Sequence, residues 1–161
     1  MIGIDIIDLQ DPLLKNRTGS DRFILHPEDR IIRDFWDYWT AKEAIFKCQR
    51  KTGPFKPKDI PINFLSDKNF DSKGWKGTVI STEDYCLSLA GVVAEHCIFN
   101  RETPNSSQEI RHKITRWFLE EHHIETSVIS DAQGLPILSH NQSPISLTHH
   151  GRFMAFACIS N

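Results

Sequence analysis

The sequence predicts an α+β fold in two unequal pieces, and three observations support this class. A short β-branched segment opens the chain, a long amphipathic segment follows it, and short apolar segments separated by polar turns fill most of the rest. The resulting order is β-α-loop-β-β-β, a linker, and then α-β-β-β, which is a mixed arrangement. A chain of 161 residues with 39% hydrophobic residues is long enough to bury a core.

The first piece covers residues 1–104 and is expected to hold a strand, a helix and further strands. Residues 2–9 are apolar and β-branched, as in a buried strand. A helix is expected from about Pro27 to about Arg50, because acids follow the proline and apolar residues recur at helical spacing. A loop follows, in which residues 60–65 are a possible strand, and consecutive strands are expected at residues 77–81, 85–89 and 92–99.

The second piece covers residues 105–161 and follows a polar linker at residues 101–108. A helix is expected from about residue 108 to residue 122, with Ser106 or Ser107 as its N-cap. Short apolar segments after it predict a second group of strands. These are residues 126–129, 135–138 and 153–159, and residues 145–148, just before the paired histidines, form a further apparent strand.

Composition limits the classes of function. The net charge is −2, so no overall basic surface for nucleic acid is expected. The four cysteines are scattered without a CxxC pair, which indicates buried free thiols in a reducing cytosol. No apolar segment approaches the ~20 residues of a membrane span, and the first residues have no basic leader. We therefore expect a soluble, cytoplasmic protein that does not contact membranes.

The expected long helix carries a glutamate and a lysine one turn apart. Glu43 and Lys47 are at positions i and i+4 on one face, and Trp39 lies one turn earlier. One interpretation is an exposed ion pair that contributes ~0.3–0.5 kcal/mol. The other is a carboxylate that binds metal or accepts a proton, beside an ammonium that contacts phosphate.

The first strand contains a carboxylate among apolar residues. A buried Asp5 needs a partner or a metal, whereas a half-exposed strand would let it point to water. Side chains alternate along a strand, so Ile7 shares a face with Asp5 and Asp8 points the other way. Asp8 is therefore a poor second ligand for the same ion.

Adjacent histidines follow the strand candidate at 145–148, and they precede a glycine and an arginine. His149, Arg152 and backbone N–H groups suit phosphate recognition. The alternatives are polar residues of a hairpin turn, or a zinc site, which no cysteine or histidine spacing supports.

Together these segments resemble the 4′-phosphopantetheinyl transferase superfamily. That family has a GxD strand, a WxxKExxxK helix and a strand of the form (I/S)SxSHxxxxA. The corresponding segments here are Gly3-Ile-Asp5, Trp39-Thr-Ala-Lys-Glu-Ala-Ile-Phe-Lys47, and Ser146-Leu-Thr-His149 leading into Phe153-Met-Ala155. The helix motif is the most specific of the three.

The resemblance implies a holo-acyl-carrier-protein synthase type of enzyme. Such enzymes transfer the phosphopantetheine arm of coenzyme A to a serine of an acyl carrier protein and release 3′,5′-ADP. By resemblance, Asp5 and Glu43 hold Mg²⁺, Glu43 also accepts the serine proton, and Lys47 contacts the phosphates. The cofactor-binding set implied in this way is Lys42, Lys47, Thr148, His149 and Arg152.

The resemblance also implies an antiparallel sheet packed against a long helix, with the cofactor between two halves. Residues 1–104 resemble the metal-binding half and residues 105–161 part of the other. We therefore expect His149 to meet Glu43 across an interface, either within one chain or, preferably, between copies in a homo-oligomer.

Two departures from the family pattern leave other functions open. Ile7 stands where the larger members carry a second strand glutamate, and Leu135 stands where they carry the lysine of a Gly-Lys-Pro turn. These departures favour, as an alternative, a non-catalytic module that binds coenzyme A or a carrier protein. A further alternative is a hydrolase that uses Cys158 and His149.

Overall fold

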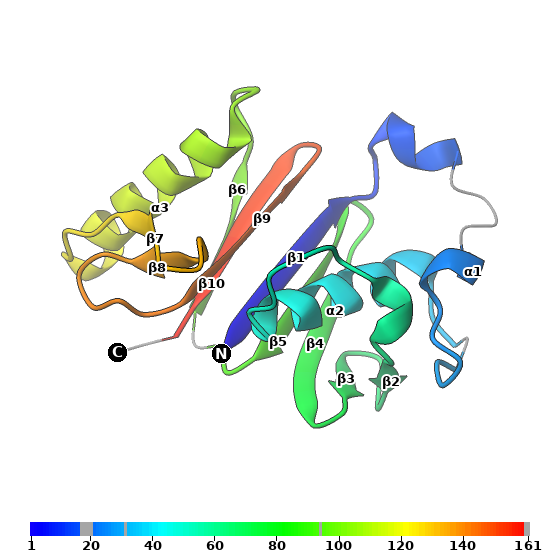
Figure 1. Cartoon of the computed structure of the whole chain (residues 1–161). Helices are drawn as coiled ribbons and strands as arrows, with labels where there is room; N and C mark the ends of the chain where they lie inside the picture. The colour runs from blue at the N-terminus through cyan, green and yellow to red at the C-terminus, as the bar shows by residue number, and fades with distance from the viewer. Residues whose placement is uncertain (17–20, 31, 94, 160–161) are drawn as a thin grey trace.

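The computed structural model describes residues 1–16, 21–30, 32–93 and 95–159. Its larger sheet is antiparallel and has the strand order β1-β5-β4-β3-β2. Helix α2 (Phe35–Cys48) lies across one face of this sheet, as Figure 1 shows. The strands are β1 (Ile2–Asp8), β2 (Asn63–Phe64), β3 (Asn69–Ser72), β4 (Trp75–Ser81) and β5 (Tyr85–Gly91).

The smaller sheet has the order β6-β10-β9 and carries helix α3 (Ser106–His122) on one side. Its strands are β6 (Glu95–Asn100), β9 (Ile145–His150) and β10 (Phe153–Cys158), and a separate hairpin pairs β7 (Val128–Ser130) with β8 (Pro136–Leu138). Ile110, Ile114 and Phe118 of α3 pack on Phe156 in one buried cluster. Short helices η1 (Pro12–Asn16), α1 (Asp21–Ile24) and η2 (Pro57–Asp59) occupy the connections.

Strand β1 and helix α2 approach each other closely because the strand has a glycine at the contact. A Cβ atom on Gly3 would lie 1.9 Å from the carbonyl oxygen of Ala44. The glycine of the GxD segment is thus required by backbone contact with α2. This contact places Asp5, on the same face of β1, directly beneath the helix.

Strands β1 and β9 lie side by side, although they belong to different sheets (Figure 1). Side chains of β9 accept hydrogen bonds from alternate backbone N–H groups of β1. The pairs are Ser146 Oγ with Ile4 N at 3.1 Å, Thr148 Oγ1 with Ile6 N at 3.4 Å and His150 Nδ1 with Asp8 N at 3.2 Å. The residue numbers of β1 and of β9 increase in the same direction along these three bonds, so the two strands run parallel.

The α+β arrangement agrees with the predicted class, but helix α2 begins eight residues later than the expected start at Pro27. Residues 26–30 instead form a turn in which Asp29 accepts backbone N–H bonds from His26 and Ile62. These tertiary contacts compete with the helix. Ile31, which contributed to the expected apolar spacing, lies outside the described residues.

Three smaller expectations also change. The N-cap of α3 is Asn105 rather than Ser106 or Ser107, and its side chain accepts from Gln108 N. Strand β9 continues through His149 and His150 instead of ending at Thr148. Strand β6 pairs with β10, so it joins the smaller sheet, while the boundary at residue 104 stays a prediction.

Within the part of the chain that the structure describes, no helix combines the length and apolar character needed to cross a bilayer.

Candidate functional site

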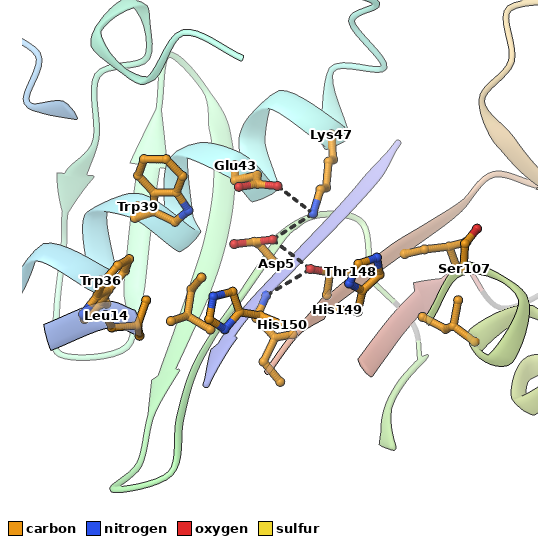
Figure 2. Close-up of a pocket in the computed structure, with 14 residues that line it drawn as sticks. Asp5, Leu14, Trp36, Trp39, Glu43, Lys47, Ser107, Thr148, His149 and His150 are labelled. Carbon is orange, nitrogen blue, oxygen red and sulfur yellow. Dashed lines mark hydrogen bonds and ion pairs between the residues drawn. The ribbon is translucent and has the colours of Figure 1, made fainter. Parts of the chain in front are cut away.

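A pocket of about 400 Å³ opens where α2, β1 and β9 meet. In Figure 2, side chains of α2 face those of β9 across β1. The lining residues are Asp5, Ile6 and Ile7 of β1, Leu14 of η1, Trp36, Trp39, Glu43 and Lys47 of α2, Ser107 and Ile110 of α3, and Leu147, Thr148, His149 and His150 of β9.

Asp5 is the buried carboxylate of this pocket, with its side chain 4% exposed. Its Oδ1 accepts hydrogen bonds from Lys47 Nζ at 2.8 Å and from the Thr148 hydroxyl at 2.9 Å. Its Oδ2 is also buried and has no hydrogen-bond partner among the described residues. Burial raises the pKa of Asp5 to about 6, although the nearby ammonium of Lys47 opposes the shift.

Lys47 connects the two carboxylates that the sequence singled out. Its Nζ lies 2.8 Å from Asp5 Oδ1 and 3.2 Å from Glu43 Oε1, and it also donates to the carbonyl of Ile4. Burial disfavours its charge, but Asp5 and Glu43 outweigh burial and raise the pKa of Lys47. Two carboxylates share one ammonium, so the cluster has a negative charge when both are ionised and attracts a further cation.

His149 approaches the same pocket from β9 and remains exposed to solvent. Its Nε2 lies 3.2 Å from Ser106 Oγ at the start of α3. Partial burial and the positive charges of Arg101 and Lys47 lower the pKa of His149. Glu43 and His149 therefore meet within one chain, and the pocket does not require a second copy to bring them together.

Two of the predicted cofactor-binding residues, Lys42 and Arg152, do not line the pocket. The structure corrects the assignment of Lys42, and that of Arg152 stays a prediction. The Lys42 side chain is 0% exposed and pairs with Asp29 at 2.6 Å, so it cannot reach a ligand. Arg152 turns to the far end of β1, where it contacts Asp8 at 2.9 Å and Asp84 at 3.0 Å. Asp8 itself points away from the pocket, as the alternation of the strand predicted.

Several lining residues were not recognised in the sequence. Trp36 shares a helix face with Trp39, three residues later, and this spacing was the available signal. Ser107 and Ile110 of α3 join the pocket only through the packing of the smaller sheet against β1. No local pattern in the chain predicts that contact.

The residues present fit a divalent cation held against phosphate. Asp5 Oδ2 is an acceptor left without a hydrogen-bond partner in the described part of the chain. The carboxylate of Glu43 contacts the same Lys47 ammonium that Asp5 contacts. The described residues contain no group of three or more His, Cys, Asp or Glu side chains arranged as metal ligands. Mg²⁺ commonly takes one or two protein carboxylates and completes its octahedron with phosphate oxygens and water.

The comparisons with known proteins agree with this chemistry. A family model described as the 4′-phosphopantetheinyl transferase superfamily matches residues 1–98, which include Asp5, Glu43 and Lys47. No curated protein and no solved structure matches the chain. The family match covers more than half of the 161 residues. The chain therefore belongs to the 4′-phosphopantetheinyl transferase superfamily, whose chemistry is phosphopantetheinyl transfer.

Proposed function

We propose that this protein transfers the 4′-phosphopantetheine group of coenzyme A to a serine of an acyl carrier protein, with Mg²⁺ as the metal. The observation that supports it most strongly is a pair of carboxylates, Asp5 and Glu43, that both contact the Lys47 ammonium. His149 lines the same pocket. Family membership supplies the class of transfer. The cluster supplies groups that suit a diphosphate and a cation.

In the proposed reaction, the serine oxygen attacks the phosphorus that carries the pantetheine arm. The bond from that phosphorus to the bridging diphosphate oxygen breaks, and 3′,5′-ADP leaves with the electron pair. Glu43, whose side chain is 27% exposed, accepts the serine proton directly or through a water. Lys47 attracts the diphosphate through its positive charge, and His149 binds the nucleotide end of the cofactor.

Asp5 Oδ2 and Glu43 would hold the Mg²⁺ ion. When bound, the ion neutralises charge on the diphosphate and helps to align it for displacement. The protein contributes a rigid frame for both carboxylates, because β1 and α2 are in direct backbone contact at Gly3. Lys47 keeps the carboxylates together by contacting both of them.

Intact-mass measurement tests the proposal directly. Purified protein is mixed with coenzyme A, Mg²⁺ and several unmodified carrier proteins, and a carrier is expected to gain one phosphopantetheine group. Glu43→Gln should lower the rate by at least about 100-fold, as expected for loss of a general base. Glu83→Gln makes the same chemical change at an exposed turn outside the pocket, so it should leave the rate unchanged.

The same experiment separates transfer from simple binding. Coenzyme A that binds while every carrier stays unmodified would instead support the non-catalytic module that Ile7 and Leu135 suggested. Full transfer by Glu43→Gln would contradict the role assigned to this carboxylate. Coenzyme A binding measured with and without metal then shows whether the cation contributes to cofactor affinity.

The hydrolase alternative loses support from the geometry. Cys158 is 2% exposed in β10, and burial raises the pKa of its thiol to about 11. His149 pairs with Met154 on that strand, four residues before Cys158. The thiol and the imidazole are therefore not adjacent. All four cysteines are free, as the sequence predicted, and all but Cys97 are buried.

A further inference from the structure

Thr148 holds a different position in the contact between β1 and β9 from that of its neighbours. Ser146, Thr148 and His150 each accept one N–H of β1, at 3.1, 3.4 and 3.2 Å. Of the three, Thr148 also donates its hydroxyl proton to the Asp5 carboxylate, at 2.9 Å. Figure 2 shows these two bonds meeting at the Thr148 oxygen.

The direction of these bonds determines which oxygen of Asp5 remains available. The Thr148 oxygen accepts from Ile6 N, so its own proton is directed to Asp5 Oδ1. Oδ1 thus receives two donors, the hydroxyl and the Lys47 ammonium at 2.8 Å. Oδ2 receives no hydrogen bond from the described residues, although it is buried at the edge of the pocket.

Two donors on one oxygen fix the rotation of a carboxylate. Without the hydroxyl, Lys47 is the one donor to the Asp5 side chain that remains among the described residues, and one flexible ammonium can pair with either oxygen. The second donor, on the rigid strand β9, removes that freedom. Partners of this kind, behind a metal ligand, orient the ligand and tune its affinity.

We propose that Thr148 is a positioning residue that holds Asp5 with Oδ2 turned to the cation, instead of contacting the nucleotide itself. This inference rests on the proposed function, because it takes Asp5 as a metal ligand. The smaller sheet would then contribute to the metal site, because Thr148, the residue that orients the Asp5 carboxylate, belongs to strand β9. The catalytic groups themselves lie on β1 and α2.

Four variants isolate this role. Thr148→Val keeps the shape of the side chain and removes the hydroxyl, whereas Thr148→Ser keeps the hydroxyl. Ser146→Ala is the matched control, because it also removes the acceptor of one β1 N–H, and among the described residues Ser146 makes no hydrogen bond to the Asp5 carboxylate. Asp5→Asn shows whether the binding that is measured occurs at this site.

The main readout is the affinity of the free protein for Mn²⁺ in the absence of coenzyme A. The relaxation rate of water protons monitors this binding. We expect Thr148→Val to weaken Mn²⁺ binding about 10- to 100-fold, as loss of such a partner typically does. Thr148→Ser and Ser146→Ala should bind Mn²⁺ as the wild type does. Affinity for coenzyme A without metal should be the same in the wild type, Thr148→Val, Thr148→Ser and Ser146→Ala.

Several results would overturn the inference. They are wild-type Mn²⁺ affinity in Thr148→Val, an equal loss in Ser146→Ala, or a loss of metal-free coenzyme A affinity in Thr148→Val, which would indicate direct contact with the cofactor. A wild-type protein that binds no Mn²⁺, or that binds it undiminished after Asp5→Asn, overturns it as well. The proposed function fails separately, when Mn²⁺ binding depends on Asp5 and Thr148 but no carrier is modified.

Discussion

Two lysines on helix α2 show how differently one residue type is used on the two faces of one helix. Lys42 faces the interior, is 0% exposed and pairs with the equally buried Asp29 at 2.6 Å. Lys47 faces the pocket, is 24% exposed and contacts Asp5 and Glu43. The first holds the loops around α2 in place, and the second belongs to the site. The surroundings of each ammonium, rather than the motif position, decide its role.

The electrostatics of the two lysines differ in the same way. Burial lowers the pKa of Lys42, although the hydrogen bond and charge of Asp29 oppose that shift. At Lys47 two carboxylates outweigh burial and raise the pKa. One face of α2 therefore carries a closed pair whose hydrogen bonds also reach the carbonyls of Pro57 and Ile60. The other carries an open cluster with excess negative charge.

Replacing each lysine by methionine should have the largest effect and separates the two faces. Lys42→Met leaves the Asp29 carboxylate buried without its partner, which costs roughly 3–5 kcal/mol of unfolding free energy. Lys47→Met should change unfolding much less, because its surroundings are partly open to water, but it should reduce phosphopantetheine transfer about 100-fold or more. Urea denaturation and the transfer rate measure the two effects.

The opposite result would contradict this distinction between the two faces: a larger loss of stability in Lys47→Met, or a loss of transfer without a loss of stability in Lys42→Met. If Lys47→Met unfolds more easily than Lys42→Met, the pocket cluster is a main source of stability. If Lys42→Met folds as well as the wild type and transfers slowly, this lysine acts in the site despite its burial. Circular dichroism before each assay confirms that the variants are folded.

Gly3→Ala should have an intermediate effect, because it changes the contact that both faces share. The added Cβ would lie 1.9 Å from the Ala44 carbonyl oxygen and 2.7 Å from Cys48 N, so β1 and α2 must move apart. Overpacking of this kind costs about 1–3 kcal/mol. Separation of Asp5 from Lys47 should lower transfer as well.

A glycine far from the site provides the control for that change. Gly74 has φ +89° in the turn between β3 and β4, and a Cβ there meets no atom within 4 Å. Gly74→Ala should therefore destabilise the fold through backbone strain while leaving the transfer rate of the folded protein unchanged. Equal losses of transfer in the two variants would show that general destabilisation explains the Gly3 effect.

The sequence predicted the parts of this molecule that depend on local patterns. Apolar, β-branched residues identified β1, and helical spacing identified α3 and most of α2. The pairing of Glu43 with Lys47 follows from one helical turn. The sequence left open whether Asp5 is buried or faces water, and the structure shows it buried. These local patterns therefore singled out the residues of this cluster but did not show that they lie together.

The parts that the sequence did not predict depend on contacts between distant residues. Pro27 and the acids after it fit a helix start locally, but Asp29 instead forms a tertiary pair with Lys42. Arg152 was expected at the pocket and is bound by Asp8, 144 positions away. Strand β3, in a polar stretch, was missed because its pairing with β4 stabilises it more than its composition does.

The smallest expected effect concerns Asp8, at the end of β1 beyond the pocket. Arg152 donates to both oxygens of this carboxylate, at 2.9 Å each, and these bonds lower the pKa of Asp8 from 3.8 to about 2. A pKa that is lower in the folded state stabilises the fold above pH 3.8, and this contribution is lost as the pH falls toward 2. Asp8→Asn should therefore lower the Tm at neutral pH, and the difference from the wild type should shrink below pH 4.

Asp84 is the control for this last prediction, because it contacts the same guanidinium at 3.0 Å from an exposed position. Asp84→Asn should change the Tm much less than Asp8→Asn, since water screens an exposed pair. A Tm difference for Asp8→Asn that stays constant between pH 7 and pH 2.5 would show that the shape of the side chain matters rather than its charge. In that case Arg152 would hold the turn between β9 and β10 through hydrogen-bond geometry, and the ionisation of Asp8 would contribute nothing.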